Sequence, residues 1–236
     1  MFGKKKQQVA ETSGVTYRRA KTWRIALAGC SSGIGMCFYV LLGLASYVAN
    51  EGYGIATAVV GIILTATRIL DGVTDPIIAI VFDKMNTRFG KIRILMAAGW
   101  VIESLAVLIM YCWASGKGHG IVLFVILYCL YIIGYTMCNV TAQIVPAMLT
   151  NDPKQRPMVG VWSTAYNYLV PMILNIVIMV MLLPKYGNVY SVEMLAASCI
   201  VCVAVSGVGL ILCCIAVTDI EKPENFKGVS TQQKAE

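Results

Sequence analysis

Residues 68–77, Arg-Ile-Leu-Asp-Gly-Val-Thr-Asp-Pro-Ile, place three ionisable groups inside a run that is otherwise apolar. Arg68, Asp71 and Asp75 are spaced i, i+3 and i+7, so they share one face of a helix. A charged side chain at the centre of a membrane helix costs roughly 2.5–3.5 kcal/mol and therefore marks function or a buried pair. Arg68 can pair with Asp71, whereas the two carboxylates repel unless a proton or a small cation lies between them. The pattern favours a cation or proton site, and a structural ion network is the alternative.

A further acid, Glu103, lies near the middle of a different apolar run. Three arrangements are open for its side chain. It can line the same cavity as the acids of residues 68–77, pair with Arg68, or lie unpaired and protonated between helices.

Polar side chains also form two stripes at helical spacing. Tyr135, Asn139 and Gln143 share one face, and Thr164, Asn167, Tyr168 and Asn175 share another. Such side chains can simply join helices, at about 0.6 kcal/mol each in membrane measurements. Two aligned stripes that each carry an aromatic ring suit a hydroxylated ligand, so we expect a solute path here, with helix packing as the alternative.

The composition shows which elements must hold these residues. Of the 236 residues, 58% are hydrophobic and 13% are charged, against about 25% charged in ordinary soluble domains. The apolar residues form runs near or above the roughly 20 residues that cross a bilayer. The predicted spans are 24–49, 55–82, 92–114, 121–148, 158–183 and 191–217. The sequence therefore predicts an all-α, multi-pass membrane protein with six transmembrane helices in contact with the lipid bilayer.

Lysine and arginine lie mostly on one side of the predicted spans. Sixteen of the 19 basic residues fall in four segments, which are 1–24, 83–93, 151–157 and 219–236. The loops of the opposite side hold only Lys117 and Lys185. Because basic loops stay in the cytoplasm, we expect both termini there, in the cell membrane. The expected organisation is a basic segment 1–23, a bundle 24–218 and a polar tail 219–236.

Several other chemistries find no support in the sequence. All nine cysteines lie inside predicted spans, where cysteine behaves as a small apolar residue. His119 is the single histidine, and the predicted loops contain no nucleophile motif, His-acid cluster or nucleotide-binding loop. The net charge of +7 is a topology signal. We therefore expect no enzyme activity, no nucleic-acid partner, no cofactor, and no metal beyond a possible Na⁺ at the acidic site.

One segment carries a longer pattern. Its residues are Asp71, Asp75, Pro76, Asp83, Thr87, Arg88, Gly90, Lys91 and Arg93, with Gly61, Arg68, Tyr135, Thr136, Pro146 and Arg156 elsewhere. This pattern resembles the glycoside–pentoside–hexuronide:cation symporters, the melibiose permease-like group of the major facilitator superfamily. The resemblance covers roughly residues 25–165.

The resemblance implies roles for several residues. Asp71, Asp75 and Thr136 would bind the coupling cation, Na⁺ or H⁺, with Arg68 as charge partner. A cytoplasmic gate loop would comprise Asp83, Arg88, Gly90, Lys91, Arg93 and Arg156. The implied function is cation-coupled transport of a sugar, glycoside or related solute.

The sequence departs from the family at the sugar-recognition positions. Counted from Asp71 without gaps, the family's two sugar-binding aspartates fall at Gly35 and Asn139, its aromatic position at Gln143, and its sugar-contacting arginine near Thr164. The cation half of the site is kept and the charged sugar half is changed. A different glycoside, a uronide or a solute that is not a sugar all stay open.

The superfamily has two six-helix halves with the substrate between them, and the predicted spans account for the N-terminal half. We expect a fragment or split-gene product that works with a C-terminal six-helix half, with a second copy of this chain as the alternative partner. A non-transporting membrane subunit or regulator derived from such a transporter is the competing hypothesis.

Overall fold

The computed structural model describes residues 11–12, 15–16, 20–84, 90–150 and 152–218. Within these residues, six helical segments are long and apolar enough to cross a membrane. They are Thr22–Gly52, Thr57–Phe82, Lys91–Trp113, Gly120–Pro146, Arg156–Lys185 and Val192–Val217. A helix satisfies its backbone hydrogen bonds internally, which is what an apolar run needs in a bilayer. The predicted class, an all-α membrane bundle, is confirmed.

The elements follow one another in a simple order. They are β1 (Glu11–Thr12), β2 (Val15–Thr16), α1 (Thr22–Ala28), α2 (Cys30–Tyr47), α3 (Thr57–Lys84), α4 (Lys91–Leu108), α5 (Gly120–Leu149), α6 (Arg156–Ile176), α7 (Leu183–Lys185) and α8 (Val192–Val217). Short π-helical segments extend α2 (Val48–Gly52), α4 (Ile109–Trp113) and α6 (Val177–Leu182). The two-residue strands β1 and β2 pair antiparallel.

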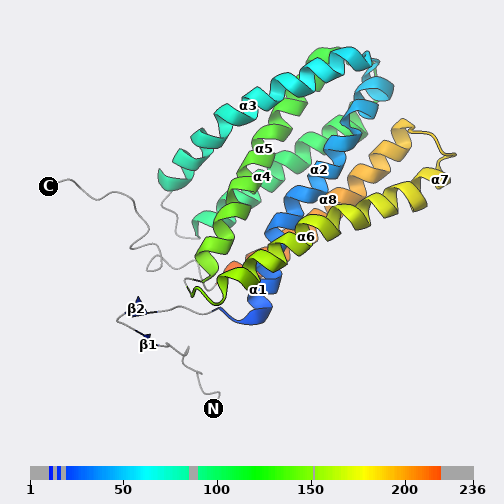
Figure 1. The fold of residues 1–236 in the computed structure, drawn as a ribbon. Coiled ribbons are helices and arrows are strands. Elements are labelled where there is room, and N and C mark those ends of the chain that lie inside the picture. Colours follow the sequence, from blue (N-terminus) through cyan, green and yellow to red (C-terminus); the bar gives the residue numbers. More distant parts are fainter. Residues whose placement is uncertain (1–10, 13–14, 17–19, 85–89, 151, 219–236) are drawn as a thin grey trace.

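α2 contacts α5 on one side and α6 on the other, and α8 also packs against it. α4 and α5 share the most extensive interface, and α3 leans mainly on α5 at one flank of the bundle (Figure 1). α6 lies at the opposite flank. The end of α3 and the starts of α1, α4 and α6 lie at one end of the bundle in this view.

Two glycines bring α4 and α5 together. A Cβ on Gly134 would lie 2.7 Å from the backbone nitrogen of Glu103 and 2.8 Å from the carbonyl oxygen of Gly99. A Cβ on Gly99 would lie 2.8 Å from the Cβ of Met137. Small residues allow this close backbone approach between membrane helices, so this crossing sets the position of α5 and of the polar residues it carries.

Aromatic rings of α5 then fix its rotation against α2. Phe124, Tyr128, Tyr131 and Tyr135 follow one another along the helix with ring centroids 5.7–6.1 Å apart. The Tyr131 hydroxyl donates to the carbonyl oxygen of Phe38 in α2 at 3.2 Å. A buried tyrosine hydroxyl needs such a partner. Tyr135 is the last ring of the row and lies half-buried beside α2.

The outward faces of α3 and α6 are the least covered. Only 11% of the apolar window is buried in each of these spans, against 61% in the first span. Large apolar side chains such as Ile69 and Tyr168 are more than two-thirds exposed. In a membrane protein these faces meet lipid or further helices.

Candidate functional site

The charged stretch lies in the middle of α3. Arg68 Nη1 is 3.3 Å from Asp71 Oδ2, so the ion pair that the spacing allows is formed in the structure. The Arg68 side chain is 56% exposed and that of Asp71 only 20%. Asp75 is exposed and lies within electrostatic range of Asp71. Both acids therefore follow one face of α3, with Asp71 nearer the bundle.

The second oxygen of Asp71 is the unusual atom of this cluster. Asp71 Oδ1 is buried and accepts no hydrogen bond from any described residue. Burying a carboxylate oxygen without a partner is costly. A proton, or a hard cation that takes oxygen ligands, would satisfy it, so the chemistry of this atom fits either kind of ion.

Two hydroxyl groups adjoin this acid and connect α3 to α5. Thr74 Oγ1 donates to the backbone oxygen of Asp71 at 3.2 Å and lies 3.5 Å from Thr136 Oγ1. Either hydroxyl could be the donor in this second contact. Thr136 is 1% exposed, so it lies at the α3–α5 contact. The structure thus pairs Arg68 with Asp71 and connects Thr136 to the same turn of α3 through Thr74.

Thr74 was not among the predicted site residues. Its signal in the sequence is its position, one helical turn after Asp71. The described residues contain no group of three or more His, Cys, Asp or Glu side chains that could hold a metal ion.

The predicted solute path is distributed over two helices. On α5, Tyr135 and Asn139 are half-buried and Gln143 is exposed. The Tyr135 ring lies beside α2, where a Cβ on Gly35 would be 3.9 Å from the Tyr135 Cε2 atom. The position at which the family carries an acid is thus a glycine that leaves space next to this ring.

On α6, Thr164 is exposed and Asn167 is half-buried. Their neighbour Tyr166 packs on α2, where a Cβ on Gly33 would lie 3.7 Å from the Tyr166 Cβ. α2 therefore lies between the two polar stripes, and within the described residues no hydrogen bond joins the α5 stripe to the α6 stripe.

The predicted gate loop is described only in part. Arg88 lies outside the described residues, and Asp83 belongs to the last turn of α3 without a described side chain. Gly90 precedes α4 with φ +97°, a conformation that favours glycine. Lys91 and Arg93 are half-buried in the first turn of α4, and Arg156 is exposed at the start of α6.

A pair of hydrogen bonds near this loop was not predicted. Gln155 accepts from the backbone nitrogen of Ala20 at 3.0 Å and donates to its carbonyl oxygen at 3.1 Å. This exchange joins the residue before α6 to the segment before α1. Gln155 lies between Lys154 and Arg156, and nothing in this local sequence indicates such a contact.

Of the three arrangements open for the Glu103 side chain, the structure excludes the pair with Arg68. It is fully buried between α4 and α5, while Arg68 pairs with Asp71. The arrangement with an Arg68–Glu103 pair is therefore not the one in the structure.

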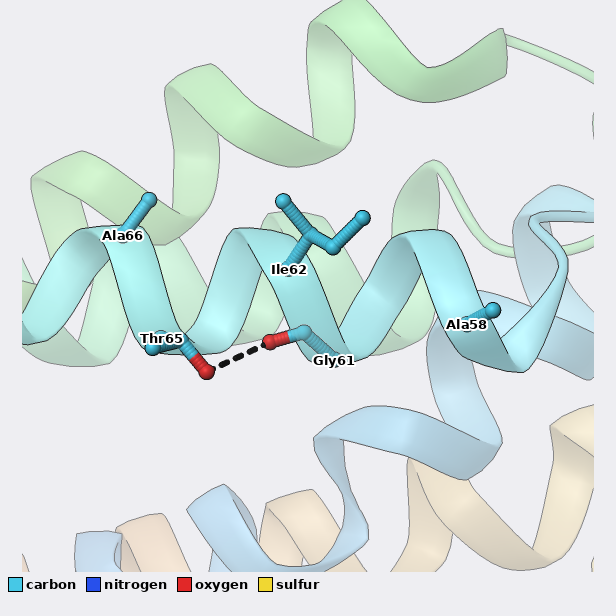
Figure 2. Close-up of a pocket in the computed structure, with 5 residues that line it drawn as sticks. All are labelled: Ala58, Gly61, Ile62, Thr65 and Ala66. Atoms are coloured by element: carbon cyan, nitrogen blue, oxygen red, sulfur yellow. Dashed lines mark hydrogen bonds between the residues drawn. The ribbon is translucent and has the colours of Figure 1, made fainter.

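The outward face of α3 carries a shallow open groove of about 430 Å³. Ala58, Gly61, Ile62, Thr65 and Ala66 line it, as Figure 2 shows. The Thr65 hydroxyl donates back to the Gly61 carbonyl oxygen at 2.8 Å, so this polar group is satisfied within the helix. The groove suits helix packing better than ion binding.

Comparison with known proteins identifies relatives of this bundle. The model of the family described as MFS/sugar transport protein matches residues 27–235. The "Putative glycoside/cation symporter YagG" of Escherichia coli (strain K12) is 25% identical over 129 residues, which is 54% of this chain and 28% of that protein.

Two further relatives agree with this. The "Inner membrane symporter YicJ" of Escherichia coli (strain K12) is 27% identical over 47% of this chain and 24% of its own length. The "Lactose permease" of Leuconostoc lactis is 29% identical over 48% of this chain and 18% of its own length. The matched region therefore spans about a quarter of the length of these relatives.

Proposed function

Because the chain belongs to the MFS/sugar transport protein family, we propose that it forms one six-helix half of a cation-coupled symporter for a sugar, glycoside or related solute. Two of the relatives are named as symporters, and one of these names specifies a glycoside and a cation. The family is one of transporters, which agrees with the expectation that the chain is no enzyme.

The observation that carries the proposal is the free oxygen of Asp71. Asp71 Oδ1 is buried and unpartnered, while Arg68 holds the other oxygen. The Thr136 hydroxyl lies 3.5 Å from that of Thr74, which in turn bonds the backbone oxygen of Asp71. Together with Asp75, these groups offer only oxygen ligands, which Na⁺ prefers, and a carboxylate that can take a proton instead. Arg68 offsets the charge when the site is empty.

The solute path follows the two polar stripes beside α2. Tyr135 offers a ring face, and Asn139, Gln143, Thr164 and Asn167 offer hydrogen-bonding groups of both kinds. Ligand sites combine apolar or aromatic surface with a few convergent polar groups. Since none of these five side chains is charged, the path suits a neutral, hydroxyl-rich solute.

A second six-helix body completes the transporter in this proposal. The outward faces of α3 and α6 are the least buried of the bundle, and alternating access requires two bundles that rock about a central site. Either a C-terminal half or a second copy can supply this body. Both termini face the cytoplasm in the cell membrane, where Asp83, Arg88, Gly90, Lys91, Arg93 and Arg156 form the gate.

Thermodynamic coupling between cation and solute tests the proposal. By reciprocity, a cation that raises solute affinity must itself bind more tightly when the solute is present. We expect a neutral glycoside from a panel to bind the purified chain, together with a second six-helix body, more tightly in Na⁺ or at low pH. Asn139→Ala should weaken solute binding and leave cation binding alone intact. Equal solute affinity at every Na⁺ concentration and pH contradicts the proposal.

A further inference from the structure

Glu103 is the most completely buried acid of the described chain. It lies in α4 with 0% of its surface exposed, and neither carboxyl oxygen accepts a hydrogen bond from a described residue. Neither the family match nor the site on α3 gives this residue a role. A carboxyl group in such a place carries either a negative charge without a donor or a proton.

The groups around Glu103 come from two neighbouring helices. From α5 these are Tyr131, Tyr135 and Cys138, and from α2 Cys37. The Cys202 thiol of α8 lies within electrostatic range of Cys37. None of these side chains is a cation at neutral pH, so no described neighbour can balance a charge on Glu103.

The polar group beside the carboxyl is the Cys138 thiol. That thiol directs its weak hydrogen bond to the Met96 carbonyl oxygen, with a sulfur-to-oxygen distance of 3.7 Å. Its sulfur is therefore left as a weak acceptor for the O–H of a protonated carboxyl, whereas a carboxylate would find no strong donor. The chemistry of the neighbours favours the neutral acid.

Glu103 has no exposed surface, so water does not reach its carboxyl in this structure. Gly134 of α5 lies directly against the backbone nitrogen and the Cβ of Glu103, and Gly99 lies against Gly134. Exchange of a proton needs water or another carrier at the oxygen atoms. Because Gly134 packs directly on Glu103, we expect this exchange to depend on separation of α4 and α5 at the glycine crossing.

We propose that Glu103 is a proton-binding site that keeps its proton for as long as α4 and α5 remain in contact at Gly99 and Gly134. The bound species is H⁺, because a hard cation needs several oxygen ligands and the described residues contain no group of three or more His, Cys, Asp or Glu side chains that could hold a metal ion. The site is separate from Asp71, which is partly exposed and paired with Arg68. Whether Glu103 keeps its proton therefore depends on whether α4 and α5 are in contact or separated.

Infrared difference spectroscopy on the purified full chain at neutral pH tests this protonation. A protonated carboxyl has a C=O stretch at higher frequency than carboxylates and amides. We expect Glu103→Gln to remove such a band and the matched control Glu193→Gln, an exposed glutamate of α8, to remove none. A wild-type spectrum from which E103Q removes no acid band overturns the proposal.

A second measurement needs no variant of Glu103. In wild-type chain labelled with ¹³C at the glutamate δ-carboxyl, the acid band should shift, because it belongs to a glutamate. Glu51 and Glu193, the other glutamates with described side chains, are exposed, so we assign the band to the buried Glu103. After transfer to D₂O the band should exchange slowly, and at least tenfold faster in Gly134→Ala, which holds the helices apart. An unshifted band, or equal exchange rates in both proteins, overturns the proposal.

The result is independent of the cation site on α3. Asp71→Asn should leave the Glu103 band in place. A protein that shows the Glu103 band but binds no Na⁺ would therefore contradict the cation site on α3 alone. A protein that binds Na⁺ but shows no Glu103 band would contradict the proton site alone.

Discussion

Replacing Gly134 by alanine is a direct perturbation of the bundle. The added methyl would lie 2.7 Å from the backbone nitrogen and the Cβ of Glu103, and 2.8 Å from the Gly99 carbonyl oxygen. Non-bonded carbon atoms prefer about 3.5–4.0 Å, so α4 and α5 must separate by about 1 Å at this point. The opposing atoms belong to the backbone or are fixed directly to it, and no side-chain rotation removes the contact.

The magnitude follows from two opposing effects. Overpacking of a well-packed site costs about 1–3 kcal/mol, and alanine is about 0.5–1 kcal/mol better than glycine inside a helix. Because the contacts are with backbone atoms of two residues, we expect the upper part of the first range. The free energy of unfolding should therefore fall by about 2 kcal/mol.

The assay is reversible unfolding of the purified chain in detergent by titration with a denaturing surfactant. Tryptophan fluorescence follows it, since Trp100 lies in α4 one residue from Gly99. The matched control is Gly43→Ala in α2, where no atom lies within 4 Å of the added Cβ, so its stability should stay equal or rise. A Gly134→Ala chain as stable as wild type, or a Gly43→Ala chain that loses as much, refutes the reasoning.

Two further predictions concern hydrogen bonds between helices. Trp100 Nε1 donates to Ser206 Oγ at 2.9 Å, so Ser206→Ala should lower the free energy of unfolding by about 1 kcal/mol, measured in the same titration; no loss would show that this bond adds nothing. The Tyr53 hydroxyl donates to the Met110 carbonyl oxygen at 3.0 Å, and burial raises the pKa of Tyr53 to about 12. An unfolded tyrosine loses its proton near pH 10, so the stabilisation is present below pH 10 and is lost as the pH rises toward 12. Over that interval wild type should lose stability faster than Tyr53→Phe, by up to about 1.4 kcal/mol per pH unit; parallel pH profiles of the two proteins contradict this.

The class of fold could be predicted because membrane helices have a simple requirement. A run of about 20 apolar residues needs no partner to form a helix in a bilayer. The close crossing of α4 and α5 could not be predicted in the same way. Gly99 and Gly134 are two among 21 glycines, and nothing in their local sequence shows that they face each other.

The candidate site could be predicted along a helix better than across helices. The Arg68–Asp71 pair follows from i, i+3 spacing within α3, and the structure forms it. The contact between Thr74 and Thr136 depends on how α3 leans on α5, which periodicity does not determine. For the same reason the sequence left three arrangements open for Glu103.

The polar stripes show the same limit. The spacing places Tyr135 and Asn139 on one face of α5, and Asn167 on a face of α6. It cannot show that α2 lies between these helices. The relation of the two stripes is a property of helix packing, and their role in solute binding stays a prediction.

The central claim, that Asp71 holds the coupling ion, is tested most directly by calorimetry of Na⁺ and H⁺ binding to the purified chain. Wild type and the control Glu193→Gln should bind one of these ions saturably, and Asp71→Asn should abolish the binding, with Asp75→Asn weakening or abolishing it. Folding of each variant is checked by the fluorescence of Trp100. Saturable binding that persists in folded Asp71→Asn, or no binding to folded wild type at any pH or Na⁺ concentration, would contradict the claim.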